Sequence, residues 1–158
     1  MMNHKKWLEH TVEMATDNVV NGGGPFAAIV VKDGEIIGSG TNLVESTCDP
    51  SAHAELLAIR EACTKLQTLD LSDCVLYASG EPCPMCLGAS YWSAVGEIIY
   101  ACSKQDAYME VGFTNPVQDF FPDQQLPPEK RSIPFIQQKT DNSTKPFIEW
   151  NKRQSKSV

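Results

Sequence analysis

Residues 74–101 read CVLYASGEPCPMCLGASYWSAVGEIIYA, and this stretch decides the fold. It begins with an apolar run at 74–77, continues into a helix expected at 86–94, and closes with a second apolar run at 97–101. A strand, a helix and a strand in this order form a crossover, which makes neighbouring strands parallel. The stretch therefore predicts part of a sheet with a helix packed on it.

The residues before this crossover extend the same pattern. Apolar side chains recur at helical spacing over 4–20, and two short apolar runs at 26–31 and 35–40 flank a Lys-Asp-Gly turn, which is typical of a hairpin. Another helix is expected from His53 to about Leu66, and it completes a second crossover. The fold class predicted is α/β, with three α/β/α layers around a mixed central sheet.

Beyond Gly112 the pattern weakens. Prolines interrupt residues 115–128, which we expect to form a long surface segment, followed by a short extended piece at 133–136 and a terminal helix at 144–152. A length of 158 residues and a hydrophobic content of 42% fit one domain with its own core.

His53, Cys83 and Cys86 carry the side chains that zinc prefers. Zn²⁺ takes four tetrahedral ligands and accepts imidazole nitrogen and thiolate sulfur, so three residues leave the fourth position to water. Zinc lowers the pKa of bound water from about 15.7 toward about 7, which makes hydroxide available at neutral pH. Glu55 is expected on the first helical turn, pointing away from His53 and free to carry protons. The spacing predicts one zinc ion, a bound water or hydroxide, and Glu55 as the catalytic residue.

Both halves of this site are expected at helix starts. Residues 49–51, Asp-Pro-Ser, are typical of a helix cap, and an apolar run follows them. Pro84 directly follows Cys83, and proline suits the first helical position because no needed hydrogen bond is lost there. The positive end of a helix favours thiolate over thiol. Backbone amides near Ala54 and Cys83 are also expected to steady a substrate carbonyl or a developing charge.

With these motifs the chain resembles the zinc-dependent cytidine-deaminase superfamily of base and nucleoside deaminases. Its signature, His-Ala-Glu followed by Pro-Cys-x-x-Cys, stands here at 53–55 and 82–86. The stretches at 23–26, 81–92 and 106–113, together with Asn42, look most like the small bacterial guanine deaminases of that superfamily. The resemblance covers most of the chain. It implies a cytidine deaminase-like fold and the deamination of guanine to xanthine and ammonia, as part of purine metabolism.

The resemblance also implies a substrate pocket. Phe26 and Trp92 look like its aromatic walls, and Asn42 like an amide that reads one ring edge with a donor and an acceptor. Packing alone also explains the two aromatic residues, and turn chemistry alone also explains Asn42. The complete set of expected substrate contacts is Phe26, Asn42, Ala54, Glu81, Trp92 and Asn115.

In the similar guanine deaminases, the C-terminal segment crosses to a second subunit and helps to close its active site. The resemblance thus implies a homodimer in which about residues 130–158 of the single 1–158 domain are swapped. Two departures stand out. The similar enzymes carry an aspartate shortly after Gly-Phe, whereas here Asn115 follows, and the last residues, 156–158, offer no aromatic side chain as a cap. Because an aspartate accepts two donors and an amide offers one donor and one acceptor, Asn115 favours a different ring edge.

Charge and cysteine content narrow the partners. A formal net charge of −7 disfavours a nucleic acid, so a small nucleobase is the expected substrate. The polar start and the absence of a long apolar run predict a cytoplasmic protein without membrane contact. In a reducing compartment the other cysteines are expected as buried, unpaired residues, namely Cys48, Cys63, Cys74 and Cys102.

Three functional classes stay open. The first is a deaminase of a free base, with cytosine, guanosine or an amino-triazine such as ammeline as alternatives to guanine. The second is a structural zinc module, which needs a fourth ligand such as Cys74 or Cys102. The third is an enzyme that edits tRNA or single-stranded DNA, for which the expected basic stripe is lacking.

Overall fold

The computed structural model describes residues 4–113, 120–133 and 135–155. The chain divides into two compact units, Met1–Val117 and Gln118–Val158. The first unit contains the sheet and both halves of the predicted zinc motif.

A four-stranded mixed sheet forms the centre of the first unit, in the order β2-β1-β3-β4. Its strands are β1 (Ala27–Lys32), β2 (Glu35–Thr41), β3 (Val75–Gly80) and β4 (Glu97–Cys102). β1 pairs antiparallel with both β2 and β3, whereas β3 and β4 pair in parallel. The crossover at 74–101 therefore makes its two strands parallel neighbours, as predicted.

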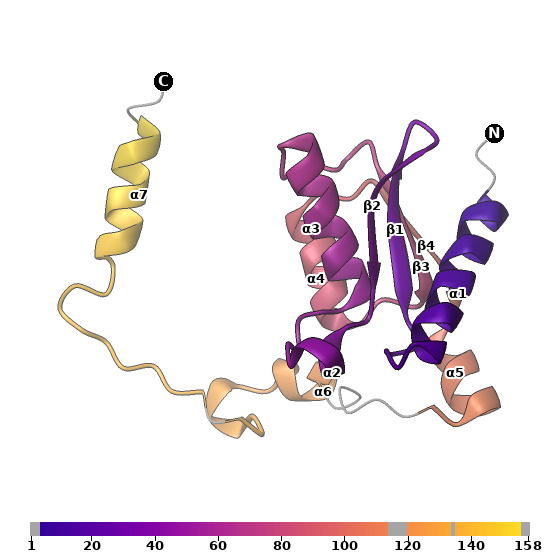
Figure 1. Ribbon diagram of the computed structural model, residues 1–158. Coiled ribbons are helices and arrows are strands. Elements are labelled where there is room, and N and C mark those ends of the chain that lie inside the picture. The colour runs from indigo at the N-terminus through magenta and orange to yellow at the C-terminus, as the bar shows by residue number, and fades with distance from the viewer. Residues whose placement is uncertain (1–3, 114–119, 134, 156–158) are drawn as a thin grey trace. The chain divides into compact units, whose positions relative to one another are not determined.

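Helices cover both faces of this sheet (Figure 1). α1 (His4–Val20) lies on one face, and α3 (Ala54–Leu66) and α4 (Pro84–Trp92) lie on the other. Successive residues of β1 alternate between the two sides: Val30 joins the core cluster that contains Ala58, and Ile29 joins the cluster against Trp7. This alternation follows from the two-residue period of a strand. The predicted three-layer α/β/α architecture is confirmed.

Two glycines let α3 lie close to the sheet. A Cβ atom built on Gly38 would overlap the carbonyl oxygen of Ala58, and one on Gly40 would overlap the carbonyl oxygen of Ala54. Only a residue without a side chain fits at both places. The N-terminal end of α3 is thereby held against β2.

Three details of the first unit differ from the sequence predictions. Asp49 does not cap α3, because its carboxylate accepts hydrogen bonds from the amide and hydroxyl of Ser51 and closes a turn before the helix. The short helix α2 (Val44–Thr47) was not expected. Nor was α5 (Lys104–Val111), whose ends are set by a capping box of Ser103 and Asp106 and by Gly112 in the left-handed conformation.

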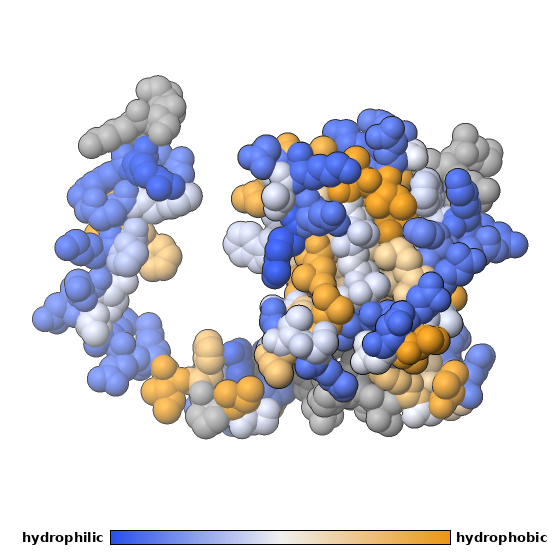
Figure 2. Space-filling model, viewed as in Figure 1, coloured by the Kyte–Doolittle hydropathy of each residue, from blue (hydrophilic) through white to orange (hydrophobic). Residues whose placement is uncertain are grey.

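The second unit consists of α6 (Phe120–Gln125), the short 3-10 helix η1 (Pro128–Lys130) and α7 (Lys145–Ser155). α7 confirms the predicted terminal helix, and Figure 2 shows hydrophilic side chains over most of its visible face. α6 lies inside the stretch expected to lack regular structure. Residues 135–140 form neither helix nor strand, and Pro134 lies outside the described residues.

Candidate metal and substrate site

His53 and Cys83 occupy equivalent positions in two helices. Each is the residue just before its helix and has extended backbone angles, with φ −76° and ψ 148° for His53 and φ −73° and ψ 169° for Cys83. Pro84 fills the first position of α4, which confirms that the Pro-Cys-Pro stretch opens a helix. Cys86 follows within the first turn and is fully buried.

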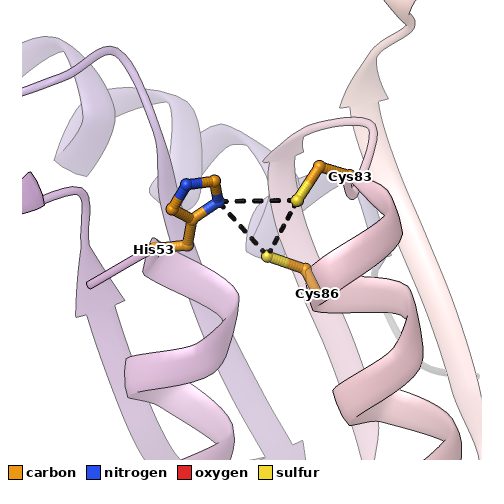
Figure 3. Close-up of side chains that lie close together, drawn as sticks. All are labelled: His53, Cys83 and Cys86. Carbon is orange, nitrogen blue, oxygen red and sulfur yellow. Dashed lines mark hydrogen bonds between the residues drawn. The ribbon is translucent and has the colours of Figure 1, made fainter. Parts of the chain in front are cut away.

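The three side chains point toward one another (Figure 3). Nδ1 of His53 lies 3.5 Å from the Sγ atom of Cys83 and 3.5 Å from that of Cys86. The two sulfur atoms are also 3.5 Å apart. Tetrahedral zinc with bonds of about 2.0 Å to nitrogen and 2.3 Å to sulfur would separate these atoms by roughly 3.5–3.8 Å. The triangle therefore has the size and the donor set of a zinc site.

Three ligands leave a tetrahedral ion one open position. Within the described ranges, His53, Cys83 and Cys86 make up the group of potential metal ligands, with all ligand atoms within 4.8 Å of one another. Cys74, one suggested fourth ligand, is buried in the core cluster that faces α3, and its thiol hydrogen-bonds to Asp73. The donor set fits a catalytic site better than a closed structural one.

Glu55 lies beside this triangle. Its side chain is only 5% exposed, and Oε2 accepts a hydrogen bond from Sγ of Cys86 at 3.4 Å. The sequence reading placed Glu55 pointing away from His53, but both side chains line the same cavity. The residue is outside the ligand triangle yet close enough to exchange protons with a molecule bound there.

The pKa directions follow from this packing. Hydrogen bonds from Cys86 and His53 lower the pKa of Cys83 to about 4, while the hydrogen bond to Cys83 raises the pKa of Cys86. The hydrogen bond with Cys83 also raises the pKa of His53. Burial raises the pKa of Glu55. The raised pKa of Glu55 suits a group that must both take up and return a proton.

A cavity of about 480 Å³ opens next to the triangle, a size typical of small-molecule sites. Its walls come from α1, the loop before β1, the end of β3 and α5. Phe26 and Phe113 form part of the wall. Their rings pack edge-to-face, with the ring centroids 5.7 Å apart. Glu81, on the loop between β3 and Cys83, also lines the cavity.

The sequence of residues 1–102 matches the zinc-binding region of cytidine and deoxycytidylate deaminases. The chain belongs to this deaminase family. It is 45% identical over 150 residues to the guanine deaminase of Bacillus subtilis, with 94% of each chain covered. The crystal structure of the Bacillus subtilis guanine deaminase matches with a TM-score of 0.88 over 96% of this chain and 95% of the other.

Two more relatives match a smaller part of the chain. A structure of the protein NE0047 in complex with 2,6-diaminopurine is 37% identical, with a TM-score of 0.66 over 72% of this chain and 64% of its own. A tRNA-specific adenosine deaminase of Aquifex aeolicus is 49% identical, but over only 49% of this chain and 51% of its own. The match to this editing enzyme therefore covers a smaller share of the chain than the match to guanine deaminase does.

Not every expected substrate contact of this deaminase lies at the cavity. Phe26 and Glu81 line it, but Asn42, Ala54 and Trp92 are not among the lining residues of the described chain. Oδ1 of Asn42 accepts a hydrogen bond from the amide of Val44, and Ala54 is packed in the core. Trp92 is 90% exposed at the far end of α4. Asn115 lies outside the described residues.

Sequence reasoning missed most of the cavity wall in the deaminase. Val12, Thr16 and Val19 from α1 and Tyr108 from α5 line it. The apolar α1 residues belong to the helical spacing noted over 4–20, but that spacing alone does not show that they line a cavity. No sequence pattern predicted α5: Ala107, Tyr108 and Val111 line the cavity, and no residue of the helix is buried.

The remaining cysteines are only partly as expected. Cys74 is buried and Cys63 is half-buried against the core, but Cys48 and Cys102 are exposed. Cys48 ends α2 with a positive φ of 52°, and Cys102 ends β4 at the cavity. No helix in the described ranges combines the length and the apolar character that crossing a bilayer requires.

Proposed function

We propose that this protein is a zinc-dependent aminohydrolase that converts guanine and water into xanthine and ammonia. The observation that carries the proposal is the His53–Cys83–Cys86 triangle with Glu55 beside it, at the edge of a cavity of base-sized dimensions. Similarity to guanine deaminase along 94% of the chain supports guanine as the base.

His53, Cys83 and Cys86 would hold one zinc ion. When bound, the ion would act as a Lewis acid that makes water nucleophilic at neutral pH. Cys83 is already inclined to the thiolate form that a metal requires, because hydrogen bonds from Cys86 and His53 lower its pKa. The two helix starts contribute positive partial charge, which favours both thiolate ligands.

Glu55 is the proposed proton carrier. It removes a proton from the attacking water, whose oxygen bonds to C2 of guanine, and delivers that proton to the adjacent ring nitrogen. A second proton moves from the new hydroxyl group through Glu55 to the amine, the C2–N bond breaks, and ammonia leaves. Burial raises the pKa of Glu55, which suits a group that must both accept and donate.

The proposed substrate contacts follow the cavity. Phe26 offers a ring face or edge to the base, and Phe113 supports that ring by packing edge-to-face against it. Asn42, Ala54, Trp92 and Asn115 remain proposed contacts whose roles depend on substrate binding or on a second subunit.

We further propose a homodimer in which the segment from about 130 onward completes the partner's site. Phe147, Ile148 and Trp150 of α7 are about half exposed or more in the single chain, as expected of an interface. Mixing a Glu55→Gln chain with a chain truncated after Ser132 tests this. Activity in the mixture, with none in either chain alone, supports the swap, and an inactive mixture of folded dimers speaks against it. A cytoplasmic location stays a prediction.

The experiment for the reaction is an ammonia-release assay with zinc-loaded protein across guanine, guanosine, cytosine, cytidine, adenine and ammeline. The proposal expects the highest kcat/KM for guanine. A higher value for another base would keep the aminohydrolase but replace the substrate, and silence on all six would contradict the proposal.

A further inference from the structure

Glu81 is tied to the first residue of α5 by two contacts. Oε2 accepts a hydrogen bond from the backbone amide of Lys104 at 2.9 Å, and Oε1 lies 3.5 Å from Nζ of the same lysine. The backbone amide of Glu81 also donates to the carbonyl of Cys102 at 2.8 Å. Both charged side chains are about one-third exposed. Each carboxylate oxygen therefore has a fixed partner on one lysine.

These contacts join two parts of the site that are separate in sequence. Glu81 lies two residues before Cys83, on the loop that carries the first thiol into place. Lys104 starts the helix whose residues Ala107 and Tyr108 line the cavity. A carboxylate at the first amide of a helix is favourable, because that amide has no partner within the helix and the helix end is positive.

The C-terminal end of α5 also lies at the cavity, where Val111 and Phe113 line it. Gly112 ends the helix, and the amide of Phe113 donates to the carbonyl of Ala107. The ring of Phe113 then packs edge-to-face on Phe26. The short helix α5 therefore connects the contact with Glu81 to the Phe26–Phe113 pair. Where α5 lies determines the geometry of both contacts.

We propose that Glu81 is a positioning residue that fixes α5, and with it the substrate wall, relative to the metal-binding loop. This rests on the proposed function, and it replaces the expectation that Glu81 reads the base directly. Since α5 forms cavity wall and supplies none of the three metal ligands, loosening it weakens substrate binding and leaves metal binding intact. The effect extends equally to every base that fits the cavity.

Four variants in the zinc-loaded, full-length protein test the proposal. Glu81→Ala removes the hydrogen bond and the ion pair, and it raises the KM for guanine about tenfold, the lower end for a hydrogen bond to a charged group. Glu81→Gln and Lys104→Met each remove the ion pair and keep a hydrogen-bond acceptor or the backbone amide in place, and they raise KM about threefold, as a partly exposed pair allows. Lys104→Arg keeps the charge and restores a KM close to that of the wild type.

The pair Glu81→Gln and Lys104→Met forms a double-mutant cycle. If Glu81 acts through Lys104, the double variant has the same KM as either single variant. Two results would mean that Glu81 contacts the base and would overturn the proposal. One is a KM increase in the double variant equal to the product of the two single increases. The other is a change, in Glu81→Gln alone, in the order of KM values for guanine and the other bases. Asp73→Asn is the matched control, because it breaks the Asp73–Lys32 pair at 2.6 Å beyond the opposite end of β3 and should leave KM unchanged.

Hydrogen exchange gives a readout that does not need turnover. In Glu81→Ala the amides of α5 exchange faster than in the wild type, while those of α3 and the zinc content stay the same. Unchanged exchange in α5 would overturn the proposal. The two proposals can fail separately. If the wild type does not deaminate guanine but the amides of α5 still exchange faster in Glu81→Ala, the proposed function is refuted and the positioning role stands.

Discussion

At the residue scale, one imidazole faces two thiols because His53 precedes its helix. Its extended backbone angles turn the ring toward α4, and the first turn of α4 brings both sulfur atoms within 3.5 Å of Nδ1. The spacing of the motif was enough to predict these three residues. It was not enough to orient Glu55, because the direction of a side chain in a first turn depends on how the helix packs.

Cys86→Ser should abolish stoichiometric zinc binding, because the hydroxyl of serine is a far weaker zinc ligand than a thiolate. Zinc content after dialysis, measured by elemental analysis, is the readout. Cys48→Ser is the matched control, since Cys48 is exposed at the end of α2. Equal zinc in the Cys86 variant and the control would remove Cys86 from the ligand set.

Asn115→Asp should increase the preference for guanine over other bases by about tenfold. An aspartate accepts both donors on the amine-bearing edge of guanine, and a mispaired buried contact costs about 1–3 kcal/mol. The kcat/KM ratio of guanine to the next-best base is the measurement. Asn142→Asp, an exposed change of the same kind, is the control. The same ratio in both variants would place residue 115 outside the recognition edge.

At the element scale, the helices and strands of the first unit that were predicted from periodicity are those that bury a face against the sheet. α1, the β1–β2 hairpin and the crossover from β3 through α4 to β4 all do so. α5 does not, and its ends depend on capping side chains with little apolar periodicity between them. The part of the cavity wall that α5 provides was therefore not predicted from the sequence.

Gly40→Ala should lower the free energy of unfolding by about 1–3 kcal/mol, because the added methyl group would overlap the carbonyl oxygen of Ala54. It should also weaken zinc binding, since Ala54 follows His53. Urea unfolding with and without zinc measures both effects. Gly88→Ala is the matched control: nothing lies within 4 Å of its added methyl group, and a helical alanine should add about 0.5–1 kcal/mol. Equal stability in the two variants would contradict the close packing of α3 on β2.

At the scale of the whole molecule, charge separates a base deaminase from an editing enzyme. The net charge of −7 leaves little electrostatic attraction for a phosphate backbone. Sequence similarity to one part of the chain cannot separate the two classes, because tRNA-specific adenosine deaminases also match 49% to 63% of this chain. Composition and the extent of similarity therefore carry more weight here than any motif.

We expect no salt-sensitive binding of tRNA, that is, no binding whose affinity falls steeply as the salt concentration rises. Fluorescence anisotropy with labelled tRNA between about 50 and 200 mM salt measures this, a range over which a protein with 6–10 phosphate contacts loses about 10³-fold or more in affinity. Tight tRNA binding at the lower salt concentration that is lost at the higher one would contradict this prediction and would support a function in tRNA editing.

The proposed role of Glu55 is tested most directly by comparing the conversion of guanine to xanthine by the wild type and by Glu55→Gln, each loaded with one zinc ion per chain. Glutamine keeps the shape of the side chain but cannot accept and return protons, a role that contributes at least about 10²-fold to turnover. The account predicts repeated turnover by the wild type, with xanthine and ammonia formed in equal amounts, and a kcat at least about 10²-fold lower in the variant. Equal rates at equal zinc content would contradict it.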